Sequence, residues 1–253
     1  MTESPFRKWN RWVQAGALVA WGSWPGVAAS PSAEMAVRKV DEIRNPQMDY
    51  TLRCHITSFS SKDSSHASSF DVFVKGKDKT FIRQTEPADE KDRLILMRER
   101  AVWTYFPSAS KPIRVPLQER LTGDIAIGDI ARANFTNDYS ARFVPPAPGE
   151  ATSLYKIELL AVMEEVTYAR VILWANKSNF RPVKAEYYAV SGRLLKTCTF
   201  ENYKMLGGAV RPSRLVMVDA VQKDKRSIVD YDQIRLGQLS ESLFTKDRLK
   251  KIQ

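Results

Sequence analysis

The sequence has little of the residue types from which metal centres and nucleophilic active sites are built. Its 253 residues include two cysteines, Cys54 and Cys198, and two histidines, His55 and His66. Their spacing gives no cysteine–histidine cluster, so we expect no metal ion. In an oxidising compartment the two cysteines could form a disulfide. Each cysteine, however, alternates onto an apolar strand face, which favours buried free thiols.

The sequence also lacks the motifs of common active sites. Gly207-Gly208 is typical of a turn and not of a phosphate-binding loop. His66 lies among serines, but no strand-to-helix elbow holds a nucleophile there. The acidic pairs Glu164-Glu165 and Asp230 with Asp232 are typical of a hairpin turn and of a solvated strand face. We therefore expect no catalytic residues, no cofactor and no enzyme activity.

Near the N-terminus, no strongly apolar run is long enough to form a membrane-spanning helix. The run from Trp12 to about Ala29 has a strongly apolar part of about ten residues, whereas a span needs about 20. The run ends in small residues and follows three basic ones, Arg7, Lys8 and Arg11. This pattern predicts a secretory signal peptide over residues 1–30, cleaved near Ala29 or Ser30.

The charge of the chain is basic. Lysine and arginine number 39 against 29 aspartates and glutamates, a net charge of +10. Removal of residues 1–30 would lower this to about +8. A basic exported protein can associate with anionic lipid surfaces. Because no nucleic-acid recognition motif accompanies the charge, we do not expect nucleic acid as a partner.

Alternation of apolar and polar residues dominates the sequence after residue 47. Tyr50, Leu52 and Ile56, for example, fall on one face of a strand and Thr51, Arg53 and Thr57 on the other. The same pattern and its turn signals predict about eleven strands in an antiparallel meander. These are residues 48–57, 70–74, 79–85, 93–98, 101–106, 153–163, 166–175, 183–190, 194–202, 214–221 and 227–235.

Helical patterns are few. Residues 33–44 have helical spacing and end at Asn45-Pro46. A second helix is expected at 127–135 with Asp129 as a cap, and a short basic helix or frayed tail at 243–252. Since a sheet of so many strands curls or closes, these helices can cover its concave side.

Three aromatic residues lie within residues 103–106. A two-residue loop at Glu99-Arg100 predicts a hairpin that pairs Leu96 with Trp103 and Leu94 with Tyr105 on one face. Such a patch either fills a solid core or lines an apolar cavity. If the patch lines a cavity, the expected lining is Tyr50, Leu52, Ile56, Leu94, Leu96, Trp103 and Tyr105. The opposite face is the alternative lining, with Ile95, Met97, Val102 and Phe106.

Several short motifs resemble the outer-membrane lipoprotein-sorting proteins, the LolA-like superfamily. They are Trp103-x-Tyr105-x-Pro107, then Arg114-Val115, Gly123, the segment GDIARANF at 128–135, and the strand–turn–strand at 181–203. Together they span the chain from about residue 45 to about residue 250. No ligand-contacting residue of the studied carriers is matched by motif.

The resemblance implies one domain over residues 31–253, a mainly β (α+β) fold. In it, an incomplete antiparallel barrel has helices over its concave, apolar side. It further implies a monomeric periplasmic carrier that holds lipid or lipoprotein acyl chains in an apolar cavity, for transport towards the outer membrane. An inner-membrane exporter would be the donor and an outer-membrane protein the acceptor. The alternative is a periplasmic sensor of lipid or lipoprotein, or an accessory subunit of an envelope exporter.

Overall fold

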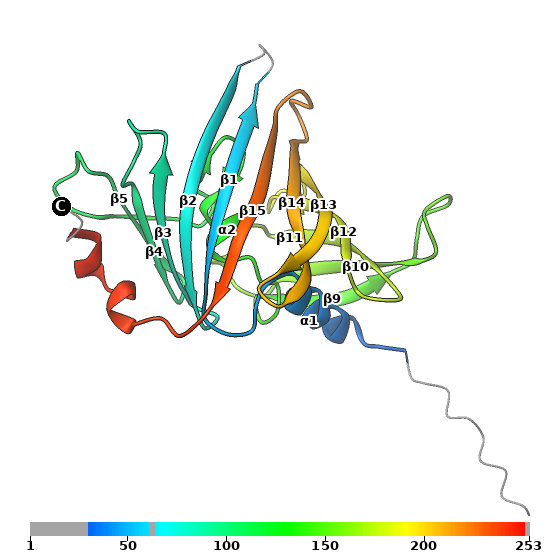
Figure 1. The fold of residues 1–253 in the computed structure, drawn as a ribbon. Coiled ribbons are helices and arrows are strands. Elements are labelled where there is room, and N and C mark those ends of the chain that lie inside the picture. Colours follow the sequence, from blue (N-terminus) through cyan, green and yellow to red (C-terminus); the bar gives the residue numbers. More distant parts are fainter. Residues whose placement is uncertain (1–29, 61–63, 251–253) are drawn as a thin grey trace, which may run out of the picture. The chain divides into compact units, whose positions relative to one another are not determined.

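Thirteen antiparallel strands form one sheet in the computed structural model, which describes residues 30–60 and 64–250 (Figure 1). Their order across the sheet is β6-β5-β4-β3-β2-β1-β15-β14-β13-β12-β11-β10-β9. The strands are β1 (Tyr50–Phe59), β2 (Ser65–Lys75), β3 (Lys79–Glu86), β4 (Leu94–Arg98), β5 (Ala101–Tyr105), β6 (Ile113–Val115), β9 (Tyr139–Val144), β10 (Leu154–Ala161), β11 (Arg170–Asn176), β12 (Pro182–Tyr188), β13 (Leu194–Leu206), β14 (Ala209–Asp219) and β15 (Arg226–Leu236).

The remaining elements are short. β7 (Arg120–Thr122) and β8 (Ile125–Ala126) pair as a small ribbon before α2 (Ile127–Ala131). α1 (Ala33–Arg44) precedes the sheet, and two 3₁₀ helices, η1 (Glu241–Phe244) and η2 (Lys246–Lys250), follow it. None of the helices in this part of the chain is long and apolar enough to cross a membrane.

The chain divides into two units, residues 1–30 and residues 31–253. Everything described below belongs to the second unit. The predicted signal peptide falls on residues 1–29, outside the described residues, and therefore stays a prediction.

The sheet curls, and one core fills its concave side. α1 contacts both β14 and the edge strand β9, which lie five places apart in the sheet. A single buried cluster joins Val40 of α1, Ile56 of β1, Ile130 of α2 and Leu159 of β10. The mainly β antiparallel fold is thus confirmed. Within the described residues the edge strands β6 and β9 do not pair, so the sheet is open and not a closed barrel.

The first helix matches its sequence signals. Ser32 caps it by accepting a hydrogen bond from the backbone N–H of Met35, and Asn45 ends it before Pro46. Its inward face also carries Asp41, whose buried carboxylate accepts the backbone N–H groups of Phe135 and Thr136. Burial raises the pKa of Asp41, and the nearby Arg44 opposes that rise. These bonds tie α1 to the segment after α2.

Three sequence expectations need correction. The predicted count of eleven strands omits β6 and β9. β6 has three residues, which are too few to show an alternation of apolar and polar side chains, and β9 runs into the proline-rich loop after Val144. The strands predicted at 48–57 and 70–74 have different bounds. β1 and β2 extend into the serine-rich stretch between them, because ladder pairing outweighs the low strand preference of serine. The helix predicted at 127–135 ends at Ala131, since the N–H of Phe135 donates to Asp41.

A second, smaller core lies on the other face of the sheet. Phe81, Leu94 and Leu96 are buried there under Phe244 and Leu249 of the C-terminal 3₁₀ helices. The segment is held at its start by Lys75, whose Nζ donates to the backbone oxygen of Leu239 over 2.8 Å. Figure 1 shows η1 and η2 beside β3–β5, away from α2. We call residues 239–249 the C-terminal strap.

Candidate ligand-binding pocket

The aromatic hairpin has the predicted register but not the predicted surroundings. Leu94 pairs with Tyr105 and Leu96 with Trp103 across β4 and β5. All four side chains pack in the smaller core under the C-terminal strap, where Lys246 lies 4.1 Å from the centre of the Trp103 ring. They therefore face away from the concave side.

The other three predicted lining residues lie on the opposite face. Ile56 is fully buried in the main core, and Leu52 packs against that core. Tyr50 is buried next to these, and burial raises its pKa to about 12. The seven residues expected to share one lining are thus divided between two faces. Strand alternation indicates which residues share a face, but it carries no information on which way the sheet curls.

The alternative lining lies on the concave side. Ile95, Met97 and Val102 are buried in the main core. Phe106, just after β5, is 37% exposed because it stands at the edge of an open pocket. Of the residues considered from sequence, Phe106, His66 and the motif residues Pro107 and Gly123 line this pocket.

The pocket has a volume of about 650 Å³. It lies between the ends of β2–β5 and the β7 segment, on the face that also carries the main core. Its wall is formed by His66, Gln84, Asp89, Glu90, Arg93, Phe106, Pro107, Ser108, Arg120, Leu121, Thr122 and Gly123. Leu121 is at the same time a buried member of the main core, so it separates the pocket from the interior of the protein. The volume is in the range of small-molecule sites, about 300–1,000 Å³.

One wall of the pocket carries two carboxylates, a histidine and a buried amide. The Gln84 side-chain amide donates from Nε2 to Glu90 Oε2 over 2.6 Å and to the backbone oxygen of Glu86 over 3.3 Å. Gln84 is 1% exposed, and its Oε1 has no hydrogen-bond partner among residues 30–60 and 64–250. His66 Nε2 lies 3.5 Å from Glu90 Oε1. Asp89 completes this wall.

Arg93 lies between this wall and β7 and also lines the pocket. It donates to the backbone oxygens of Leu121 and Arg120 over 2.8 and 3.1 Å. Its guanidinium also lies 5.0 Å from the centre of the Phe106 ring, a cation–π distance. Burial lowers the pKa of Arg93, while Glu119 and Glu90 oppose that effect. Arg93 therefore fixes the position of the β7 segment and of Phe106.

A buried ion pair binds α2 to the sheet, at the other end of the segment from β7 to α2 (residues 120–131, the β7–α2 segment). Lys196 Nζ of β13 lies 2.6 Å from Asp129 Oδ2 of α2, with both side chains at least nine-tenths buried. The Tyr168 hydroxyl donates to the other oxygen of Asp129 over 2.6 Å, and the Ala126 N–H donates to Oδ2. Burial and the Asp129 carboxylate raise the pKa of Tyr168 well above its ordinary value. The sequence indicates Asp129 as a cap, but it does not indicate Lys196 as its partner.

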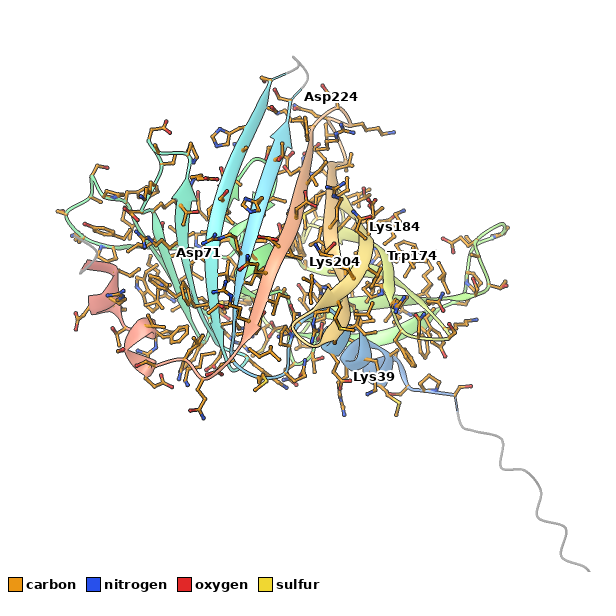
Figure 2. All side chains as sticks on the ribbon, viewed as in Figure 1. Lys39, Asp71, Trp174, Lys184, Lys204 and Asp224 are labelled. Atoms are coloured by element: carbon orange, nitrogen blue, oxygen red, sulfur yellow. The ribbon has the colours of Figure 1, made fainter. Side chains whose placement is uncertain are left out.

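The outer face of β10–β12 is polar in character. Lys156 and Lys184 lie 5.3 and 4.8 Å from the centre of the Trp174 ring, and Figure 2 shows Trp174 and Lys184 next to each other. Both lysines are ion-paired with neighbouring glutamates. Partly exposed pairs of this kind are typical of a solvated face. Within residues 30–60 and 64–250, no three His, Cys, Asp or Glu side chains are placed to hold a metal ion.

Both cysteines are free and fully buried, on β1 and β13. Burial raises the pKa of Cys54 and of Cys198 to about 12. We expect neither thiol to react with an aromatic disulfide reagent at pH 8 in the folded protein, and both to react in denaturant. A fast-reacting thiol in the folded protein, or the mass of a disulfide form, would contradict this.

The raised pKa values of the two thiols also affect the stability of the protein at alkaline pH. An unfolded thiol ionises near about pH 8.5, whereas the folded thiols stay protonated to about pH 12. The folded state thus holds these protons more tightly. Their contribution to the free energy of unfolding is complete below about pH 8.5 and is lost as the pH rises above it.

Comparison with known proteins bears on both the fold and the family. A family model whose description reads "Uncharacterized protein" matches residues 76–251. Among curated proteins, nothing matches the chain. The crystal structure of a LolA superfamily protein from Nitrosomonas europaea is 41% identical in sequence. It matches with a TM-score of 0.81 over 86% of this chain and 99% of that one.

Two further crystal structures share the fold at 19% identity. One is a DUF1329 family protein from Desulfovibrio piger, with a TM-score of 0.74 over 86% of this chain and 97% of that one. The other, from Vibrio parahaemolyticus, is described as an outer membrane lipoprotein-sorting protein domain. Its TM-score is 0.72 over 87% of this chain and 98% of that one. The identity and coverage of the Nitrosomonas match show that this chain belongs to the LolA superfamily.

Proposed function

We propose that this protein is a periplasmic carrier that binds lipid or lipoprotein acyl chains without covalent bonds and moves them towards the outer membrane. The observation that carries the proposal is the 650 Å³ pocket at the edge of an apolar, helix-covered concave face in a chain of this superfamily. No enzyme activity is part of it. The signal peptide predicted at residues 1–30 supports the compartment.

The physical argument concerns the apolar part of the pocket. Phe106, Pro107 and Leu121 offer a surface to an acyl chain, and Leu121 continues into the main core. Each methylene group that leaves water contributes about 0.8 kcal/mol. A chain that enters beside Leu121 extends its contacts by displacing the β7–α2 segment, which packs into the main core through Leu121, Ile127 and Ile130. The segment is also bonded to Arg93 and Lys196.

The proposal is tested with protein purified from the cell envelope without detergent. We expect native mass spectrometry to show bound lipid. We also expect Phe106→Ala, which removes the aromatic edge of the pocket, to bind a fluorescent fatty acid several-fold more weakly. Phe143→Ala is the matched control, because Phe143 is 38% exposed on β9 and does not line the pocket. Purified protein that holds no lipid and binds no probe would refute the carrier function.

The alternative function, a sensor or an exporter's accessory subunit, uses the same pocket for recognition. It differs in what happens after binding. A carrier should pass its lipid to acceptor membranes, whereas a sensor should keep the lipid and bind a protein partner. A lipid-transfer measurement from loaded protein to outer-membrane vesicles separates the two.

A further inference from the structure

One end of the sheet carries both the 650 Å³ pocket and the most exposed apolar side chains of the described residues. β2 begins and β3 ends at this pocket, and the pairing of Phe59 with Ser65 and with Arg226 places the β14–β15 turn at the same end (Figure 1). Val221 of that turn is 72% exposed, and Val190 of the β12–β13 turn is 94% exposed. No other large apolar side chain in the described part of the chain is as exposed as these two.

The two turns are neighbours, because the Ala220 N–H donates to the backbone oxygen of Leu195 over 2.9 Å. We call residues 189–193 and 220–225 the rim turns. A second pocket of about 240 Å³ lies beside them and is lined in part by Leu195 and Asp219. It shares Gly123 with the larger pocket. The rim turns and both pockets therefore lie at one end of the sheet.

Basic side chains outnumber acidic ones on the rim turns. Four basic side chains lie in or next to these turns and form no ion pair among the described residues: Arg193, Lys223, Lys225 and Arg226. The carboxylates of the same stretch are Asp219 and Asp224. Asp219 accepts the backbone N–H groups of Val221 and Gln222 over 2.7 and 2.6 Å, so its charge is engaged with the turn itself. The rim turns thus carry an excess of positive charge.

An anionic lipid surface fits this arrangement better than a protein surface does. Apolar side chains on separate turns can each enter the headgroup region of a bilayer, where burial of apolar surface is favourable. Lysine and arginine beside them are attracted to the negative surface potential of anionic lipids. A protein interface instead buries a continuous apolar centre and is depleted in lysine. Val190 and Val221 lie on different turns, and each turn has its own basic residues.

We propose that the rim turns dock this protein onto anionic membrane surfaces, with Val190 and Val221 in the headgroup region and the four basic side chains on lipid phosphates. This contact lies outside the pocket and does not depend on a bound ligand, so it goes beyond the proposed carrier function. The β3–β4 loop at the same end of the sheet carries Asp89 and Glu90. Like charge keeps that loop from an anionic surface and leaves the contact to the rim turns.

Co-sedimentation with lipid vesicles measures this contact, with protein purified from the cell envelope. We expect binding to vesicles of phosphatidylglycerol and phosphatidylcholine to be about tenfold tighter than to vesicles of phosphatidylcholine alone, and to be lost in high salt. Lys223→Gln combined with Lys225→Gln should weaken binding to the anionic vesicles about tenfold. Lys177→Gln combined with Lys204→Gln is the matched control and should keep the wild-type affinity. It removes two exposed lysines from the turns β11–β12 and β13–β14, at the opposite end of these strands.

An environment-sensitive dye tests which turn enters the membrane. A dye can be attached to Val221→Cys in the folded protein, because both native thiols are buried. We expect its emission to shift to the blue on the anionic vesicles. A dye on Met205→Cys should not shift, although Met205 is also 67% exposed, because it lies near the β13–β14 turn. Figure 2 shows Asp224 at the tip of the β14–β15 turn and Lys204, the neighbour of Met205, further down the sheet.

Several results would overturn the assignment. Equal affinity for the two kinds of vesicle, or unchanged affinity in a folded Lys223→Gln, Lys225→Gln variant, would remove the role of the basic side chains. A blue shift at position 205 and none at 221 would place the contact elsewhere. Binding to envelope membranes that protease treatment of those membranes abolishes, without binding to pure lipid, would identify a protein as the partner. None of these results decides whether the pocket holds lipid, which native mass spectrometry measures.

Discussion

Replacing Phe244 with alanine is expected to lower the free energy of unfolding by about 3–5 kcal/mol, the usual cost of removing a buried phenylalanine. Phe244 is 1% exposed and packs on Phe81, Leu94 and Leu96 of the sheet's outer face. The C-terminal strap contains two short 3₁₀ helices and no α-helix. Because such short helices are weak by themselves, the position of the strap on the sheet depends on the Phe244 contact.

Urea unfolding followed by circular dichroism measures the effect. Phe143→Ala again serves as control and should cost far less, because that ring is already partly in water. The Phe244→Ala variant should also expose the outer patch that includes Trp103, with a red shift of its fluorescence. A loss below about 1 kcal/mol would show that the strap does not bury this patch in solution.

Replacing Lys196 with methionine is expected to cost a similar amount, about 3–5 kcal/mol, because it leaves the Asp129 carboxylate buried without its counter-ion. The double variant Lys196→Met, Asp129→Asn should recover part of this loss, since the uncompensated charge is gone. The amide that replaces the carboxylate keeps an oxygen that can accept the Ala126 N–H. Thermal and urea unfolding of the wild type and the two variants give the comparison.

Lys184→Met is a closely matched control. Lys196 lies 5.2 Å from the centre of the Tyr168 ring. Lys184 likewise pairs with an acidic side chain and lies over an aromatic ring, but its side chain is 40% exposed. An exposed pair contributes about 0–1 kcal/mol. Equal losses at positions 184 and 196, or no recovery in the double variant, would mean that burial of the ion pair is not what stabilises the β7–α2 segment.

Local signals predicted local structure well. Ser32, Asn45 and Pro46 mark the ends of α1, and the alternation around Glu99-Arg100 predicts the register of the aromatic hairpin. In each case the interactions that decide the structure lie within a few residues. The turn at Gly207-Gly208 is another example, with both glycines at positive φ.

The candidate site depended on information that local patterns do not carry. The direction of curl decides that Phe106, and not Trp103, reaches the concave side. The partner of Asp129 is 67 residues away along the chain. Gln84 is a polar residue in a strand, and nothing in its neighbourhood in the sequence marks its amide as buried. Such juxtapositions arise only when the whole sheet is assembled.

The centre of the sheet has a consequence for how the chain reaches its folded state. β1 and β15 are neighbours there, so Tyr50 pairs with Leu236 and Phe59 with Arg226. The strands on either side of this seam are joined to one another mostly by hairpins and can form early. The seam itself needs residues from both ends of the domain, and such high contact order slows folding. A ribosome or a translocon that releases this chain gradually therefore produces two half-sheets first. The protein stays vulnerable to proteases and to aggregation until β15 pairs with β1.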